Sequence, residues 1–201
     1  PVTGIVSWDT ELMPFIELSV EDQQKLLSLA RESIQVRLLF ERDLQIDEAA
    51  FSPALQQQAS SFVTLRKKDK LRGCIGALEA SQPLVMDVVH HAAASAFEDP
   101  RFPAVTREEV AELRIEVSAL TEPTPLSFSS EADLLSQLKP DEDGLIIEMG
   151  RHRATFLPTV WSSIPDKAQF MEQLKLKAGL SADFWSDNLK VWRYHALCFQ
   201  E

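Results

Sequence analysis

Two short apolar runs, SFVTL at 61–65 and LRGCIGAL at 71–78, flank the charged segment RKKDK at 66–70. Strand-length apolar runs on either side of a short polar segment predict a β-hairpin with a charged turn. The chain has six glycines and two cysteines, and Gly73, Cys74 and Gly76 all lie in the second run. A hairpin requires two antiparallel strands, so any fold of this chain must contain antiparallel pairing. The second strand, which holds Cys74 between two glycines, is the first candidate for a functional site.

Helical and strand patterns alternate along the rest of the chain. Leucine, isoleucine and alanine recur at helical spacing over residues 20–41, and Ser19 and Asp22 stand before them at capping-box spacing. Further elements are predicted in order: helices at 83–97, 106–113, 130–138 and 165–178, a strand at 113–120, a second hairpin at 141–158 and one closing strand at 190–199. Interspersed helices and hairpins predict an α+β fold, with mainly antiparallel sheets and flanking helices.

Length and charge narrow the class of protein. A chain of 201 residues fits one large domain or two closely packed lobes. Its net charge of -11 argues against nucleic acid as a main partner, since phosphate binding needs a basic surface.

No apolar run approaches a membrane span, the first residues lack a signal-peptide pattern, and two cysteines make no disulfide framework. We therefore expect a cytoplasmic protein with no membrane partner. No CxxC or HExxH spacing occurs, so no metal site is expected.

Several longer segments together resemble the AMMECR domain family, in its bacterial and archaeal members. They are LRGCIG, HAAASAFEDPRFPAV, LRIEVSALTEP, GLIIEMGRHRATFLPTVW, KAGL and VWRYHALCFQE, and the resemblance covers about residues 20–201. It implies an α+β fold of two closely packed lobes with a cleft near the LRGCIG segment. It makes residues 1–201 a single AMMECR domain, with 1–18 as an N-terminal extension.

The resemblance also implies partners. Many prokaryotic members resemble one part of a three-part system, beside a Memo-like protein and a radical S-adenosylmethionine protein. This chain lacks the cysteine triplet of an iron–sulfur cluster, so it is not the radical enzyme itself. The resemblance implies neither a reaction nor a cofactor, and the cofactor stays unknown.

Cys74 is the candidate nucleophile. If LRGCIG is a regular strand, alternation places Arg72, Cys74 and Gly76 on one face and Leu71 and Gly73 on the other. A rise of ~3.3 Å per residue then puts Arg72 about 6–7 Å from Cys74, where a guanidinium favours thiolate over thiol. Gly76 would leave space on that face for a ligand or another backbone. The alternative, held about equally, is that Cys74 is a small packing residue.

A thiol nucleophile needs a base within reach, and histidines are the candidates. His90 and His91 are adjacent on the predicted helix and point about 100° apart, so one faces the packing side and the other is the candidate base. His152 is a candidate to enter the cleft from the second hairpin, with an exposed turn residue as the alternative. His195 lies in the closing strand, where no chemical role is expected.

The segment FEDPRF at 97–102 supplies further polar candidates. Asp99 is expected to cap the helix or pair with a nearby arginine. Arg101 is a candidate to bind an anion, and the alternative is that it belongs to a rigid loop that ends the helix. Glu116 would pair with Arg72 if its strand neighbours LRGCIG. The candidate substrate-binding residues are therefore Gly73, Gly76, Asp99, Arg101, Glu116 and His152.

Two functions remain open from the sequence. The first is an enzyme or enzyme component that uses Cys74, with Arg72 and a histidine, on a small substrate that is expected to be anionic. The alternative is a non-catalytic binding or scaffold module that uses the same cleft to hold a protein or metabolite. An accessible, reactive thiol would favour the enzyme, and a buried, inert thiol the module.

Overall fold

The computed structural model describes residues 16–201. The strands are β1 (Ser60–Lys67), β2 (Lys70–Gly76), β3 (Leu113–Leu120), β4 (Thr124–Pro125), β5 (Gly144–Met149), β6 (His152–Phe156), β7 (Lys190–Tyr194) and β8 (Ala196–Gln200). The α-helices are α1 (Val20–Phe40), α2 (Pro53–Gln56), α3 (Leu84–Phe97), α4 (Arg107–Val110), α5 (Glu131–Gln137) and α6 (Lys167–Lys177). Two 3-10 helices are η1 (Glu48–Ala50) and η2 (Pro158–Ser162).

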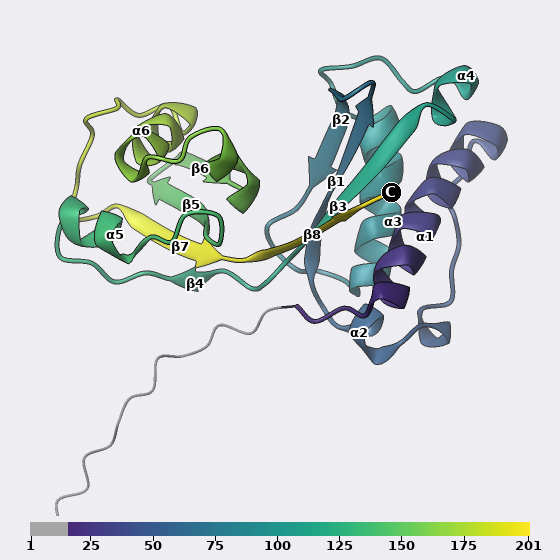
Figure 1. The fold of residues 1–201 in the computed structure, drawn as a ribbon, viewed down its shortest axis with the longest axis horizontal. Coiled ribbons are helices and arrows are strands. Elements are labelled where there is room, and N and C mark those ends of the chain that lie inside the picture. The colour runs from purple at the N-terminus through teal and green to yellow at the C-terminus, as the bar shows by residue number, and fades with distance from the viewer. Residues whose placement is uncertain (1–15) are drawn as a thin grey trace, which may run out of the picture.

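The strands form two antiparallel four-stranded sheets, in the orders β2-β1-β3-β8 and β4-β7-β5-β6. Helices α1 and α3 lie together on one side of the first sheet, and α5 and α6 lie beside the second (Figure 1). We call residues 16–120 and 196–201 the first unit, and residues 124–194 the second unit. The prediction of an α+β fold with antiparallel sheets and flanking helices is confirmed.

The second unit is inserted between β3 and β8 of the first, so the chain crosses between the units twice. The two crossings lie side by side, because the Thr121 amide donates to the His195 carbonyl at 3.0 Å and the His195 amide donates to Thr121 Oγ1 at 2.9 Å. The prediction of one closing strand at 190–199 is wrong, since the chain leaves the second sheet and enters the first at His195. Apolar residues continue on both sides of this point, so the sequence pattern conceals the break.

Three apolar clusters stabilise the fold, one inside each unit and one between the units. Side chains of α1, α3, β1 and β3 form the core of the first unit, including Leu26, Val63 and Ile115. A second core lies between the second sheet and α6 and contains Trp161 stacked on Phe170. A third cluster joins the units across their boundary, and its members are Leu120, Ile146 and Tyr194 with Phe62, Leu78, Leu157, Trp192 and Ala196 packed against them.

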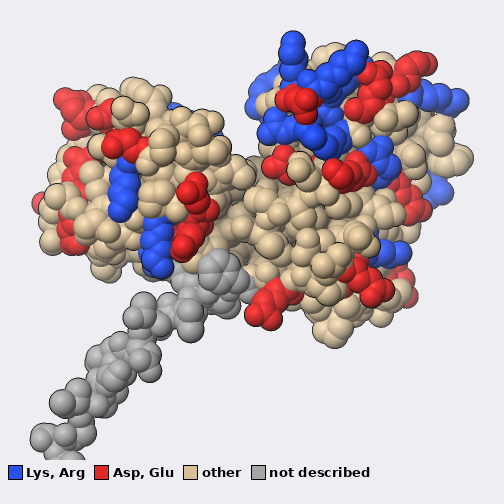
Figure 2. Space-filling model, viewed as in Figure 1, with Lys and Arg blue, Asp and Glu red and all other residues tan. Residues whose placement is uncertain are grey.

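The first hairpin is tighter than the five charged residues suggested. Strands β1 and β2 are joined through Lys68 and Asp69, which have φ angles of 50° and 62°. Positive φ at both turn residues matches the twist of two paired strands. Basic side chains gather at this end of the molecule (Figure 2), and they include Lys67 and Lys68, which pair with Glu112.

The first helix starts as predicted. The Ser19 hydroxyl accepts from the Asp22 amide, and the Asp22 carboxylate accepts from the Ser19 amide, which forms the capping box. Residues 1–15 of the predicted N-terminal extension lie outside the described residues. Ile16 and Leu18 pack against the first core, so the packed part of the chain begins before the predicted boundary at residue 18.

Gly73 allows α3 to approach β2 closely. A Cβ built on Gly73 would lie 2.1 Å from the Ser95 carbonyl oxygen, which is a backbone atom and cannot yield as a side chain would. We therefore expect Gly73→Ala to lower the free energy of unfolding by about 2–3 kcal/mol through overpacking, measured by urea denaturation. Gly150→Ala is the control, because Gly150 has open space around it and a φ of 61°, so only a smaller backbone cost of about 1 kcal/mol applies. Equal losses in the two variants would contradict this account of Gly73.

Candidate functional site

The loop that follows α3 holds both backbone groups of Cys74, its amide and its carbonyl. The Cys74 amide donates to Asp99 Oδ2 at 2.8 Å, and Arg101 Nη2 donates to the Cys74 carbonyl at 3.2 Å. The next amide, of Ile75, donates to Ser95 Oγ at 2.8 Å. Because β2 is an edge strand, the amide and carbonyl of Cys74 would otherwise remain unpaired and open to another chain. Ser95 instead links the two strands of the hairpin, because its hydroxyl also donates to the Val63 carbonyl of β1 at 2.7 Å. The loop thus closes the edge and fixes Cys74 in place.

Asp99 and Arg101, which hold Cys74, also form a tight ion pair with each other. Arg101 Nε and Nη2 donate to the two Asp99 carboxylate oxygens at 2.9 and 2.7 Å. These hydrogen bonds from Arg101 hold the pKa of Asp99 well below its usual range, although burial of the carboxyl opposes them. The Asp99 side chain is only 2% exposed, whereas that of Arg101 is 54% exposed. Arg101 can therefore meet a ligand while Asp99 serves as its anchor.

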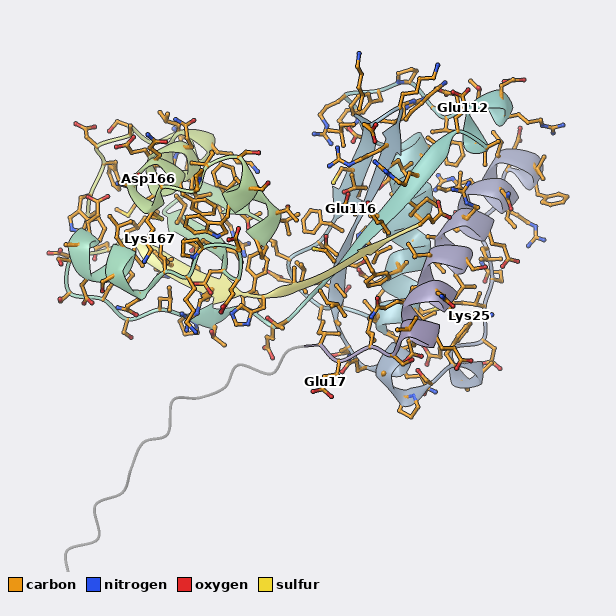
Figure 3. The ribbon with its side chains drawn as sticks, in the orientation of Figure 1. Glu17, Lys25, Glu112, Glu116, Asp166 and Lys167 are labelled. Atoms are coloured by element: carbon orange, nitrogen blue, oxygen red, sulfur yellow. The ribbon has the colours of Figure 1, made fainter. Side chains whose placement is uncertain are left out.

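The Cys74 thiol lies on the face of the first sheet opposite α3. Gly73 faces α3, and Cys74 is its neighbour along the strand, so the two point to opposite faces. Thr64, which is paired with Cys74 across β1 and β2, donates its hydroxyl to Cys74 Sγ at 3.2 Å. Glu116 lies on the same open face, away from α1 (Figure 3). Cys74 is partly exposed there.

A lysine of the second unit completes the surroundings of Cys74. Lys177, at the end of α6, donates to the Thr155 carbonyl at 2.9 Å and lies 5.0 Å from the centre of the Phe156 ring. Burial lowers the pKa of Lys177, the charge of Cys74 raises it, and the charge of Arg101 lowers it. Lys177 and Arg101 are thus both close enough to interact electrostatically with Cys74.

Arg72 is not placed as the alternation predicted. The pairing of β1 and β2 shifts between Leu65 and Arg66, so Gly73 pairs with Leu65, Leu71 pairs with Arg66, and Arg72 is left as a bulge residue. A bulge interrupts the regular alternation, and Leu71 and Gly73 therefore do not share a face. The Arg72 guanidinium instead donates to both carboxylate oxygens of Glu109, from Nε at 3.1 Å and from Nη2 at 2.9 Å.

Glu116 does not meet Arg72, because β1 lies between β3 and β2 in the sheet. Its carboxylate instead accepts from Arg66 Nε at 3.3 Å on the open face. The expected Glu116–Arg72 pair is therefore replaced by two separate pairs. Glu116 remains on the same face of the sheet as Cys74, and β1 lies between their two strands.

The predicted histidine bases are directed elsewhere. His91 is buried and its Nδ1 lies 2.9 Å from Asp87 Oδ2, while His90 is exposed on the same helix. Both belong to α3, which covers the face of the sheet opposite the Cys74 thiol. His152 lies in the second unit, with Nδ1 at 2.9 Å from the Ala178 carbonyl oxygen, and so ties β6 to the end of α6. Because of these positions, we identify none of His90, His91 and His152 as a base for the Cys74 thiol.

The two glycines of the motif serve packing. Gly73 faces α3, as described above. A Cβ on Gly76 would lie 2.4 Å from Phe62 Cγ and from the Ser61 carbonyl oxygen, so the ring of Phe62 fills the space expected for a ligand. Gly76 still contributes to the wall of a shallow pocket with Phe62 and Thr155.

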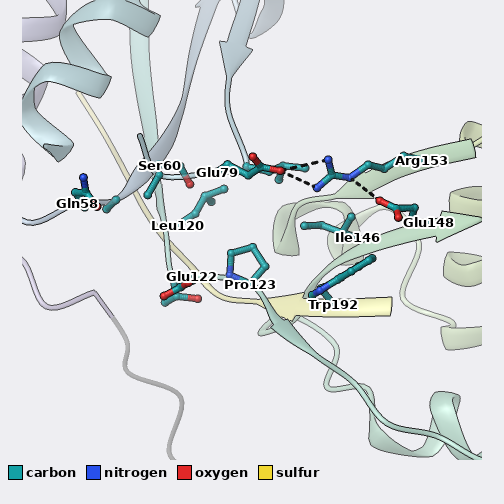
Figure 4. Close-up of a pocket in the computed structure, with 14 residues that line it drawn as sticks. Gln58, Ser60, Glu79, Leu120, Glu122, Pro123, Ile146, Glu148, Arg153 and Trp192 are labelled. Carbon is teal, nitrogen blue, oxygen red and sulfur yellow. Dashed lines mark hydrogen bonds and ion pairs between the residues drawn. The ribbon is translucent and has the colours of Figure 1, made fainter. Parts of the chain in front are cut away.

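A larger pocket of about 510 Å³ lies between the two units (Figure 4). Its walls come from the segment before β1, the segment after β2, the first crossing, β5, β6 and β7. Leu78, Glu79 and Arg153 line both this pocket and the shallow one beside Gly76. A cleft at Cys74 itself stays a prediction.

The sequence analysis missed Thr64, Lys177 and the residues of the larger pocket. Thr64 was visible only as a polar residue within the run SFVTL. Lys177 belongs to a segment that contributed to the family resemblance, but its approach to Cys74 depends on the packing of the second unit, which no local pattern records.

The fold and the site define a class of α+β protein with two antiparallel sheets. Its edge strand β2 carries a thiol, and side chains of the loop after α3 hold that strand in place. The family model described as AMMECR1 matches residues 27–199, which is most of the chain. The chain therefore belongs to the AMMECR1 family.

The relatives are archaeal. A protein of Methanothermobacter thermautotrophicus is 37% identical over 193 residues, covering 94% of this chain and 99% of its own length. A protein of Sulfolobus acidocaldarius is 35% identical over 198 residues, covering 95% of this chain and 86% of its own length. The crystal structure of the uncharacterized protein PH0010 from Pyrococcus horikoshii superposes with a TM-score of 0.85 at 34% identity, covering 93% of this chain and 94% of that one.

Two features that are absent from residues 16–201 bear on the class of site. Within this range no helix is both long and apolar enough to cross a membrane. The same range brings together no group of three or more histidine, cysteine, aspartate or glutamate residues arranged to hold a metal ion.

The Arg72–Glu109 pair gives a pH prediction. Hydrogen bonds from Arg72 are the largest cause that lowers the pKa of Glu109 from 4.5 to about 2. A lowered carboxyl pKa adds stability above pH 4.5, and this contribution is lost as pH falls from 4.5 to about 2. We expect Arg72→Met to lower the free energy of unfolding by about 2 kcal/mol at pH 7, and the difference from the parent protein to shrink across that acid window.

Denaturation in urea at several pH values measures this difference. Arg107→Met is the control, because Arg107 is exposed on the same short helix as Glu109. A loss in Arg72→Met that does not change between pH 7 and pH 3 would show that packing, and not the ion pair, explains it.

Proposed function

We propose that this protein is an enzyme, or a component of one, that binds a small anionic substrate on the open face of the first sheet and attacks it with the Cys74 thiol. One observation carries the proposal. Asp99 and Arg101 hold the amide and the carbonyl of Cys74, and two cations, Arg101 from the first unit and Lys177 from the second, interact electrostatically with Cys74.

The two cations have separate tasks in this proposal. Positive charge near a thiol stabilises the thiolate, which is the nucleophilic form. Arg101 has an exposed guanidinium that is already oriented by Asp99. Its Nε and Nη2 donate to Asp99 and to the Cys74 carbonyl, so Nη1 is the group that would donate to a carboxylate or phosphate. Lys177, at the end of α6, interacts electrostatically with Cys74 and Arg101, and burial lowers its pKa. A partly desolvated ammonium suits charge stabilisation, and it can also pass a proton to a leaving group.

Thr64 and Asp99 position the thiol in this scheme. The Thr64 hydroxyl donates to Cys74 Sγ at 3.2 Å and so orients the sulfur on the open face. Asp99 holds the Cys74 amide and thereby sets the backbone from which the thiol projects. Since the histidines described above contact other groups, the proposal uses stabilisation of the thiolate by cations in place of a cysteine–histidine pair.

A second candidate is a non-catalytic binding or scaffold module on the same surface. The placement of His90 and His91 behind the sheet favours it, because a nucleophile usually has a base within reach. Its partners would be those that the family resemblance implies, a Memo-like protein and a radical S-adenosylmethionine protein. In either case we infer one cytoplasmic domain of two lobes, because the second unit is inserted in the first and the chain's cysteines are free.

Lys177 provides the test of the enzyme proposal. In a Cys198→Ser background, we expect iodoacetamide to modify Cys74 in the folded protein at pH 7. Lys177→Met should slow this reaction about threefold, because one nearby cation at a partly exposed site stabilises an anion by up to about 1 kcal/mol. The measurement is the rate of mass increase in intact protein.

Lys139→Met is the matched control, since Lys139 is an exposed lysine of the second unit that pairs with Glu142. It should leave the rate unchanged. A Cys74 that reacts only after unfolding would overturn the enzyme proposal in favour of the binding module.

A further inference from the structure

The larger pocket between the units has the dimensions of a ligand site. Its volume of about 510 Å³ lies in the range of small-molecule pockets, which often form at the boundary between structural units. Leu120 and Ile146 of its walls are each only 1% exposed, so the apolar part of the lining belongs to the rigid cluster that joins the units. The pocket is therefore built from the packed framework of the protein.

The charged groups of this pocket come from separate segments and are mostly acidic. Glu79 follows β2, Glu122 lies in the first crossing, and Glu148 belongs to β5. Arg153 of β6 is the basic residue of the lining, and it lies between Glu79 and Glu148 in Figure 4. Its guanidinium is 3.4 Å from a Glu79 oxygen and 3.7 Å from a Glu148 oxygen.

The acidic groups are only partly neutralised. Lys190 reaches Glu148 from outside the pocket at 4.0 Å. Glu122 is exposed and lies across the pocket from Arg153 in Figure 4, and it has no ion pair within residues 16–201. Arg153, the one cation of the lining, thus already pairs with Glu79 and Glu148. The carboxylate of Glu122 remains to pair with a ligand.

The remaining walls are apolar and flat. Trp192 of β7 lines one side of the pocket, and Pro123, Leu120, Ile146 and Leu78 line the others. The face of a tryptophan ring binds both planar apolar groups and cations. Gln58 and Ser60 add neutral oxygens at the edge beside the first unit.

We propose that this pocket binds a small organic cation with a flat apolar body, whose positive group meets Glu122 and whose body lies against Trp192. A positive group supplies the charge that the acidic lining lacks. The apolar body displaces water from the tryptophan and leucine walls. This binding does not depend on the reactivity of Cys74, which lies outside the lining of the pocket.

The test uses three probes that share an indole ring and differ in charge. They are tryptamine, which is cationic, tryptophol, which is neutral, and indole-3-acetate, which is anionic. Isothermal titration calorimetry on the Cys74→Ser variant separates this proposal from the proposed thiol chemistry. We expect saturable binding of tryptamine, about tenfold tighter than that of tryptophol, and no measurable binding of indole-3-acetate.

Two variants locate the binding. Glu122→Gln should weaken tryptamine about threefold and leave tryptophol unchanged, because it removes one charge from an exposed position. Trp192→Leu should weaken both probes, because it removes the ring that both contact. Glu112→Gln is the control, since Glu112 lies beside the hairpin tip and pairs with Lys67 and Lys68. Equal affinity for tryptamine and tryptophol, absence of tryptamine binding, or an unchanged affinity in Glu122→Gln would overturn the proposal.

Discussion

The rest of the site depends on one carboxylate, that of Asp99. It accepts from the Cys74 amide and from the Arg101 guanidinium, so it joins two segments of the chain in one contact. An edge strand exposes unpaired backbone groups, and here Asp99 and Arg101 occupy the amide and the carbonyl of Cys74 in β2. The same contacts fix the position of the thiol and the direction of the arginine. A structural requirement, closing a sheet edge, thus also organises the candidate chemistry.

The insertion of the second unit explains why the site contains residues from both sheets. The chain crosses between the units at Thr121 and at His195, and mutual hydrogen bonds hold the two crossings together. The cluster around Leu120, Ile146 and Tyr194 then fixes how the second unit packs on the first. Because of this packing, Lys177 lies near the charge of Cys74, and the larger pocket forms between β5 and the crossing.

Local patterns predicted the parts of the fold that local forces decide. Ser19 and Asp22 identified the start of α1, and two apolar runs around a charged turn identified the first hairpin. The prediction failed at Arg72, where a bulge interrupts alternation, and at His195, where one apparent strand enters two sheets. Both features arise from pairing between distant segments, which periodicity does not record. For the same reason the sequence pointed to Cys74, Asp99 and Arg101 as site candidates, but it did not identify Lys177 or Glu122.

The central claim is that Cys74 is presented for reaction, and the second cysteine of the chain offers a comparison within the same molecule. Cys198 lies on the same sheet and is more exposed than Cys74, so exposure alone would favour its modification. Its thiol contacts Ser118 Oγ at 3.2 Å, and desolvation of the thiol raises the pKa of Cys198. The most direct measurement is mass-spectrometric mapping of both cysteines in the native, unmutated protein after brief iodoacetamide treatment at pH 7. The account predicts that Cys74 is modified well before Cys198. Modification of Cys198 first, or of neither until denaturant is added, would contradict it.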